Sequence, residues 1–577
     1  MTMLTKWGAA LDREHPLPEY PRPQLRRESF YNLNGVWDYA VTPSGDEPGV
    51  WDGEIVVPFS PEAPLSGAAR GPAKDEYLHY RRGFTLPEGF QKSRVLLHFG
   101  AVDQIAEVFV NGVSAAKHSG GYWPFSADIT SLLREGENIL RVTVRDNADD
   151  PTFTYGKQRY KRGGMWYTAQ SGIWQTVWLE SVPEVYVKSL RITPEFDEAR
   201  VRIELETALE SSAAITCDVR AADGSFVAGS WAKGGVCVVP LPGFRAWSPD
   251  DPYLYTLDIT CGEDRVESYF AMRKFSYMEL GGHKVFGLNN APLFHNGLLD
   301  QGYYPDGLLT PPSDEAMVND IETMKRCGFN MLRKHIKIEP LRWYYHCDRL
   351  GMIVWQDMVS GGQPYSFLHV SALPTLGKVD LPDKDAKPYG RSGVLSRARF
   401  RREMADTVRL LYNCPCIALW TVFNEGWGQF DALDMANELK KLDPTRFIDH
   451  ASGWQDQGYE EMKSRHIYFR PVKLKNDGRA LALTEYGGYI LAVDGHRWTD
   501  KVFGYRICRN SAALAHDYEK LMLGQVLPHI RKEGLTAAVY TQITDVEEEL
   551  NGLMTYDREV LKIPEETLRE INKQLKF

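Results

Sequence analysis

From about Met278 to the end of the chain, short apolar runs alternate with longer segments of helical character. Runs such as FNML, MIVW and IALW each follow a segment whose apolar residues recur at helical spacing, such as DEAMVNDIETMKRCG. Strands that alternate with helices pair in parallel, and eight such units close a barrel that typically takes about 250 residues. We therefore expect a C-terminal (β/α)8 TIM barrel over residues 278–577.

The part of the chain before the barrel shows the alternation of apolar and polar residues that is typical of antiparallel sheets. Runs such as GVWDYAV, RVLLHFG and AEVFVNG predict a β jelly-roll sandwich over residues 1–182. Runs such as VRIELET and YLYTLDIT predict a smaller immunoglobulin-like β-sandwich over residues 183–277. Three domains suit a chain of 577 residues, which is too long for one hydrophobic core.

The composition excludes several classes of function. The net charge of −10 and the pI near 5.9 argue against a nucleic-acid-binding protein, which should carry a basic face. No apolar run is long enough to span a membrane, and the N-terminus lacks the pattern of a signal peptide. The eight cysteines have no metal-ligand spacing, so we predict free thiols in the cytoplasm, with no metal ion and no cofactor.

Polar residues follow most of the predicted barrel strands. In a TIM barrel the loops after the strands build the active site, so these side chains should meet at one mouth. A single such residue is an ordinary loop residue more often than not, but their recurrence after successive strands indicates a site. The predicted site residues at these positions are Arg333, His335, Asp357, Asn424, Glu425, Trp454, Arg470 and Glu485.

Glu425 and Glu485 are the candidate catalytic residues. Hydrolysis of a glycosidic bond requires a proton for the leaving oxygen and an electron pair at the anomeric carbon, and two carboxyl groups supply both. The flanking aromatic residues Trp420, Phe423 and Trp427 should raise the pKa of Glu425 by desolvation, while Tyr468 could hydrogen-bond Glu485 and keep it ionised.

Sixty residues separate the two glutamates in the chain, and we expect two strand–helix units between them. Each glutamate alone could equally form a strand-end salt bridge, for example with Arg333. The occurrence of both in these contexts favours catalysis.

These motifs resemble glycoside hydrolase family 2, which includes β-galactosidases, β-glucuronidases and β-mannosidases. The segments LHFGAVDQIAEVFVNG, GGYWPFSADIT and SGIWQTVWLE are similar to the N-terminal sugar-binding jelly roll of that family. FNMLRKHIKIEPLRWYYHCDRLGMIVWQDM resembles its second and third barrel strands, while NEGWG and TEYGG resemble its acid/base and nucleophile motifs. The resemblance covers nearly the whole chain.

The resemblance implies a role for each matching residue. Glu425 would be the general acid/base and Glu485 the nucleophile. Asn424 would bind the 2-hydroxyl of the sugar, and Arg333 and Tyr468 would hold the nucleophile. Further predicted substrate-binding residues are His335, Asp357 and Trp454 in the barrel, and Trp166 and Tyr167 in a jelly-roll loop that reaches the barrel mouth.

Departures from the family pattern bear on the sugar. The β-glucuronidases carry an Asn-x-Lys pair after the eighth strand, but here Asn551 is followed by Gly552 and Leu553. Arg470 and Lys337 are predicted to contact an acidic sugar, although solvated or ion-paired residues are the simpler interpretation of both.

We therefore predict a retaining exo-β-glycosidase that acts on a terminal β-D-galactoside or β-D-hexuronide, with galacturonide favoured over glucuronide. The alternatives are an α-L-arabinofuranosidase or a transglycosylase on the same scaffold. A non-catalytic carbohydrate-binding protein is the alternative from another class, but it would be expected to have lost one carboxylate. The resemblance also implies a homo-oligomer.

Overall fold

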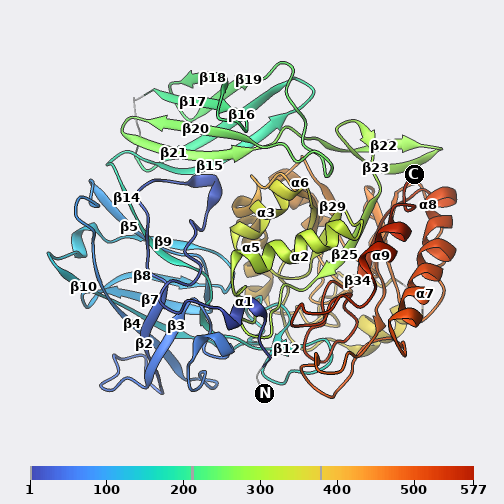
Figure 1. Cartoon of the computed structure of the whole chain (residues 1–577), viewed down its shortest axis with the longest axis horizontal. Helices are drawn as coiled ribbons and strands as arrows, with labels where there is room; N and C mark the ends of the chain where they lie inside the picture. Colours follow the sequence, from blue (N-terminus) through green and yellow to red (C-terminus); the bar gives the residue numbers. More distant parts are fainter. Residues whose placement is uncertain (1–2, 210–213, 377–379) are drawn as a thin grey trace.

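The computed structural model describes residues 3–209, 214–376 and 380–577. Its three parts follow the chain (Figure 1): an N-terminal β-sandwich in blue, a second β-sandwich in green at the top, and a barrel that runs from green to red. The predicted fold class, with a jelly-roll sandwich, an immunoglobulin-like sandwich and a TIM barrel, is confirmed. The domain boundaries stay proposals, and the one at residues 277/278 falls inside the strand β22 (Phe275–Leu280).

The N-terminal sandwich consists of two main antiparallel sheets with an apolar core between them. The six-stranded sheet has the order β3 (Gly53–Val57), β2 (Gly35–Thr42), β4 (Tyr77–Thr85), β10 (Glu137–Arg145), β7 (Ile105–Val110) and β8 (Val113–Ser119). The four-stranded sheet has the order β1 (Tyr31–Asn32), β14 (Val177–Val182), β5 (Arg94–Phe99) and β9 (Phe125–Asp128). Four short strands complete the domain: β6 (Val102–Asp103), β11 (Gln158–Arg159), β12 (Tyr167–Thr168) and β13 (Gly172–Ile173).

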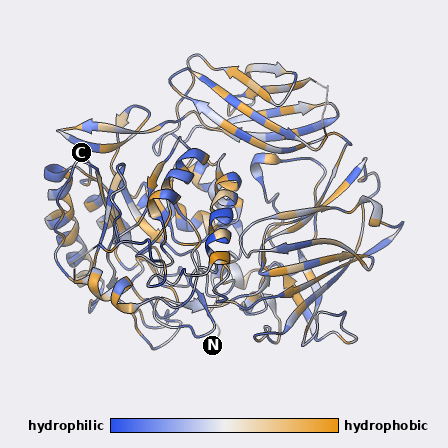
Figure 2. Ribbon diagram, turned by 180° about the vertical axis from the view of Figure 1, so that it is seen from behind, coloured by the Kyte–Doolittle hydropathy of each residue, from blue (hydrophilic) through white to orange (hydrophobic). Residues whose placement is uncertain are grey.

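The second sandwich is a smaller antiparallel pair of sheets, in which buried and partly exposed residues alternate along β20. Apolar and polar colours alternate along its strands in Figure 2, as expected for sheets with one buried face. One sheet has the order β15 (Val187–Glu195), β16 (Arg200–Thr207) and β19 (Val236–Pro240). The other has the order β18 (Phe226–Ala232), β17 (Ile215–Arg220), β20 (Tyr255–Cys261) and β21 (Asp264–Phe270). A ribbon of β22, β23 (His283–Leu288) and β24 (Ala291–Pro292) leads into the barrel.

Eight strands form the barrel, and every hydrogen-bonded pair among them is parallel. Their order is β29 (Phe447–Asp449), β28 (Ile417–Thr421), β27 (Ile353–Asp357), β26 (Met331–Lys334), β25 (His295–Asp300), β34 (Leu535–Thr541), β31 (Ala480–Gly487) and β30 (Met462–Ile467). The end strands β29 and β30 lie next to each other, so the barrel is nearly closed. A short parallel pair, β32 (Tyr489–Ile490) and β33 (Arg506–Ile507), lies outside it.

Helices cover the outside of the barrel, and their ends follow local sequence signals. Ser313 caps α2 through a hydrogen bond from Ala316 N, and Asp314 and Glu315 occupy its first turn, where acidic groups favour the helix dipole. Gly351 ends α3 in the left-handed conformation. The helices are α1 (Lys6–Ala9), α2 (Asp314–Arg326), α3 (Leu341–Leu350), α4 (Leu373–Thr375), α5 (Val394–Leu411), α6 (Ala432–Leu442), α7 (Ser511–Leu521), α8 (Leu527–Glu533) and α9 (Glu565–Asn572).

One expectation about the barrel is wrong. Along the chain, two strands, β29 and β30, lie between β28, which precedes Glu425, and β31, which carries Glu485. Only one helix, α6, lies in the same stretch of described residues. Residues 443–510 are all described and contain no helix, because loops and short strands make the connections there.

The three parts pack through buried side chains. The apolar cluster of the barrel core also includes four residues of the N-terminal domain, Tyr122, Trp123, Tyr167 and Trp174.

No helix in the described part of the chain is both long enough and apolar enough to cross a bilayer.

Candidate active site

Glu425 and Glu485 lie at the same mouth of the barrel. Glu425 follows β28 in the left-handed conformation, with φ of 53°, and its backbone N–H donates to Ser452 O at 2.9 Å. Glu485 lies near the end of β31 and is buried, while the side chain of Glu425 keeps 22% of its surface exposed. A carboxylate oxygen of each residue and one ring nitrogen of His466 lie within 4.8 Å of one another.

Arg333, on β26, contacts three of the other predicted site residues. Its guanidinium donates to both oxygens of Asp357 at 3.0 Å, to Glu485 Oε1 at 3.2 Å and to Asn424 Oδ1 at 2.8 Å. Asp357 Oδ2 also lies 2.9 Å from His335 Nδ1. Burial would raise the pKa of Asp357, but Arg333 and His335 hold it below its usual value. A fully buried guanidinium with these partners fixes the geometry of the site.

Two residues of the β30 segment contact the glutamates. Tyr468 Oη donates to Glu485 Oε2 at 2.6 Å, as predicted. His466 Nδ1 lies 2.8 Å from Glu425 Oε1 and 3.5 Å from Glu485 Oε2, while its Nε2 lies 3.3 Å from Ser452 Oγ. Burial lowers the pKa of His466 to about 4, so the ring is neutral near pH 7.

His466 was not predicted from the sequence. The available signal was the alternation along β30, because Ser464, His466 and Tyr468 are spaced by two and therefore face the same side of a strand.

The two carboxyl groups have different environments. Burial raises the pKa of Glu425 to about 7, against opposing contributions from Lys157 and Arg333. Burial also raises the pKa of Glu485, but the hydrogen bonds from Arg333 and Tyr468 favour its ionised form. Near neutral pH the arrangement can therefore combine one protonated and one ionised carboxyl group.

The aromatic residues around Glu425 make different contacts. Trp427 packs against Trp166 with ring centroids 5.0 Å apart, which brings the jelly-roll loop to the barrel mouth. Trp454 Nε1 donates to the backbone oxygen of Glu425 at 2.9 Å. Trp420 instead donates to Asp443 at 2.9 Å.

The remaining predicted residues, Tyr167, Lys337 and Arg470, lie outside these contacts. The hydroxyl group of Tyr167 donates to Glu549. Lys337 is buried and donates to the backbone oxygens of Gly302 and Leu309 at 2.5 and 2.8 Å. Arg470 is exposed, and it lines a groove of about 290 Å³ together with Tyr468, whereas neither glutamate lines it.

Among the described residues, Glu425, His466 and Glu485 are a set whose side chains are close enough to hold a metal ion. In this structure hydrogen bonds occupy the same atoms, since Arg333 and Tyr468 donate to the two oxygens of Glu485 and His466 contacts Glu425.

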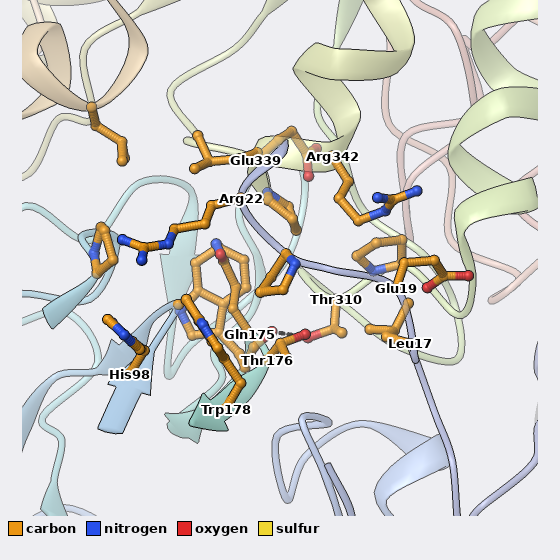
Figure 3. Close-up of a pocket in the computed structure, with 18 of the residues that line it drawn as sticks. Leu17, Glu19, Arg22, His98, Gln175, Thr176, Trp178, Thr310, Glu339 and Arg342 are labelled. Carbon is orange, nitrogen blue, oxygen red and sulfur yellow. Dashed lines mark hydrogen bonds between the residues drawn. The ribbon is translucent and has the colours of Figure 1, made fainter. Parts of the chain in front are cut away.

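A cavity of about 230 Å³ lies away from this site, between the N-terminal segment, the jelly roll and the barrel (Figure 3). Its lining includes Arg22, His98 and Trp178 on one side and Thr310 and Arg342 on the other. Neither glutamate lines this cavity.

Sequence comparison agrees with this architecture. The model for "Glycosyl hydrolases family 2, sugar binding domain" matches residues 64–183, that for "Glycosyl hydrolases family 2" matches residues 185–273, and that for "Glycosyl hydrolases family 2, TIM barrel domain" matches residues 311–474. Together they cover more than half of the chain. The chain belongs to glycoside hydrolase family 2.

Individual relatives in family 2 are distant. A β-galactosidase of Halalkalibacterium halodurans is 23% identical over 502 residues, which are 79% of this chain and 45% of the relative. The chain likewise spans less than half of the length of other curated relatives that it matches.

Solved family 2 structures share the fold over nearly the whole chain. A β-glucuronidase of an uncultured Clostridium sp. matches with a TM-score of 0.74 and 19% identity, covering 95% of this chain and 99% of the other. A β-galacturonidase of Eisenbergiella tayi bound to galacturonate matches with a TM-score of 0.71 and 18% identity, covering 96% and 99%.

Proposed function

We propose that the protein is a retaining exo-β-glycosidase. The observation that carries the proposal is the pair of carboxyl groups at one barrel mouth, with oxygen atoms within 4.8 Å of each other. Retaining glycosidases place their carboxyl groups about 5–5.5 Å apart, whereas inverting enzymes keep about 6.5–9.5 Å to admit a water molecule. The observed separation supports direct attack by one carboxylate.

The environments of the two groups support separate roles. Glu425, with its pKa raised to about 7, would protonate the leaving oxygen and later remove a proton from water. Glu485, which accepts hydrogen bonds from Arg333 and Tyr468, would attack the anomeric carbon and form the covalent glycosyl-enzyme. Asn424, oriented by Arg333, would bind the sugar 2-hydroxyl.

For the sugar, we propose a terminal β-D-galactoside or β-D-hexuronide. The names of the relatives include β-galactosidase, β-glucuronidase and β-galacturonidase, so they support this range without selecting within it. We favour galacturonide over glucuronide because the Asn-x-Lys pair is missing at Asn551. Assembly as a homo-oligomer and a cytoplasmic location stay predictions.

The experiment is a panel of nitrophenyl glycosides that covers β-galactoside, β-galacturonide, β-glucuronide, β-glucoside, β-mannoside and α-L-arabinofuranoside. We expect Glu485→Gln to lower kcat on the best substrate by roughly 10⁴- to 10⁶-fold, as for other lost nucleophiles. Proton NMR of the first product should show the β-anomer. Near-normal activity of Glu485→Gln, or an α-anomer as first product from a β-glycoside, would reject the mechanism.

A further inference from the structure

Three successive glutamates after β34 hold the jelly-roll loop at the barrel mouth. Glu547 Oε1 accepts a hydrogen bond from Thr168 N at 2.8 Å, and Glu548 Oε2 accepts one from Gly164 N at 2.9 Å. Glu549 accepts the hydroxyl hydrogen bond of Tyr167. This is the region where β-glucuronidases are expected to carry their Asn-x-Lys pair, and here its carboxylates bind the neighbouring domain.

The other end of the same loop is attached to the barrel next to Glu425. Tyr155 N and Gly156 N both donate to Ser360 O, at 3.0 and 2.9 Å. Tyr155 Oη donates to Gly362 O at 2.8 Å, and the Tyr155 ring packs against Trp427 with centroids 6.0 Å apart. The loop is therefore fixed on both sides of residue 157.

Lys157 is one of the cations of this loop. Its side chain is half-buried, and its ammonium lies 5.8 Å from the centroid of the Tyr167 ring. Within the described parts of the chain, no carboxylate lies within 4 Å of it. Its positive charge opposes the effect of burial on the pKa of both Glu425 and Glu549.

We propose that Lys157 binds the carboxylate of an acidic sugar in the barrel mouth. A partly desolvated ammonium without an ion partner, on a loop that packs against Trp427 at the barrel mouth, is suited to pair with a substrate anion. Arg470, the cation expected from the sequence to do this, lines a groove to which Tyr468 contributes but neither glutamate does. The inference rests on the proposed function, since it presumes that a sugar occupies this mouth.

A simpler role for Lys157 would be to offset the charge of Glu425 and Glu549. Removing it would then raise the pKa of Glu425 and change the rates on acidic and neutral sugars alike. Selective loss on the acidic sugar distinguishes carboxylate binding from this electrostatic role, because only the uronide loses a contact.

The test compares Lys157→Met with Lys161→Met, an exposed lysine of the same loop, and with Arg470→Ala. We expect Lys157→Met to lower kcat/KM on nitrophenyl β-galacturonide about 10- to 100-fold, mainly through KM, as for a lost hydrogen bond to a charged group. In the same variant, kcat/KM on the β-galactoside should change less than about threefold. In the other two variants, kcat/KM should change less than about threefold on either substrate. Thermal denaturation checks that each variant folds.

Equal losses on the two sugars, or a selective loss in Arg470→Ala alone, would overturn the inference. Wild-type activity on the galactoside with none on any uronide would also overturn it and leave the glycosidase proposal intact. Calorimetry of galacturonate binding to wild type and Lys157→Met tests the contact without catalysis. Equal affinities overturn it even if hydrolysis is found, whereas weaker binding in the variant supports it even if the hydrolase assignment fails.

Discussion

At the scale of single residues, the protonation of Glu425 sets the pH dependence of the proposed reaction. Burial raises its pKa to about 7, so the group donates a proton below that pH and is ionised above it. We expect kcat/KM for the best nitrophenyl glycoside to fall as pH rises through about 7. Glu425→Gln should remove this limb and lower the rate about 10²- to 10⁴-fold at pH 6.

The loss in Glu425→Gln should shrink for a dinitrophenyl leaving group, which departs without a proton. An unchanged basic limb in Glu425→Gln would show that another group titrates.

Sequence motifs predicted Glu425 and Glu485, because each follows an apolar run with glycines and aromatic residues after it. They did not predict Lys157, which belongs to a jelly-roll loop, or His466, which lies inside β30 and not directly after it.

At the scale of elements, the connection between β29 and β30 positions His466. Gly453 has φ of 94°, and a Cβ atom there would lie 2.5 Å from Cγ of the His466 ring. Gly453→Ala should therefore displace the ring from Glu425 and lower kcat/KM by about 100-fold, the scale of a misplacement of about 1 Å. Gly458→Ala is the matched control, because its φ is 82° but no atom lies within 4 Å.

Both variants carry the cost of a left-handed alanine, about 1–2 kcal/mol, so both should lower Tm. Steady-state kinetics then separates the two variants, and equal activity would show that the position of His466 does not matter.

The expectation of two helices between the glutamates failed in this same region. Short strands here continue directly into long connections, so strand–helix alternation could not be extended over residues 443–510.

At the scale of the whole molecule, buried charges hold the domains together. Arg27 in the N-terminal segment donates to Glu180 of the jelly roll at 3.0 Å and to Asp264 of the second sandwich at 2.9 Å. Arg27→Met leaves these buried carboxylates without this partner and should lower the unfolding free energy by about 3–5 kcal/mol. Arg26→Met, which removes an exposed pair with Glu267, should cost at most about 1 kcal/mol.

Scanning calorimetry of the two variants measures this difference, and equal transition temperatures would contradict a role of Arg27 in joining the domains.

The network also shows what could not be predicted from the sequence. Arg26 and Arg27 are adjacent and chemically identical, but only one points into the contact between three segments.

The sequence by itself determined the order and class of the three domains and the two candidate catalytic glutamates. These follow from local patterns: the period of apolar residues, turn signals and the residues directly after each strand. Only the tertiary structure decided the approach of the two glutamates to within 4.8 Å, the contact of His466 with Glu425, and the position of the loop that carries Lys157 at the barrel mouth. Lys157 and Glu425 are far apart in the chain and belong to different domains, so no local pattern couples them. Their placement at one mouth depends on barrel closure and on hydrogen bonds that hold the jelly-roll loop across the mouth.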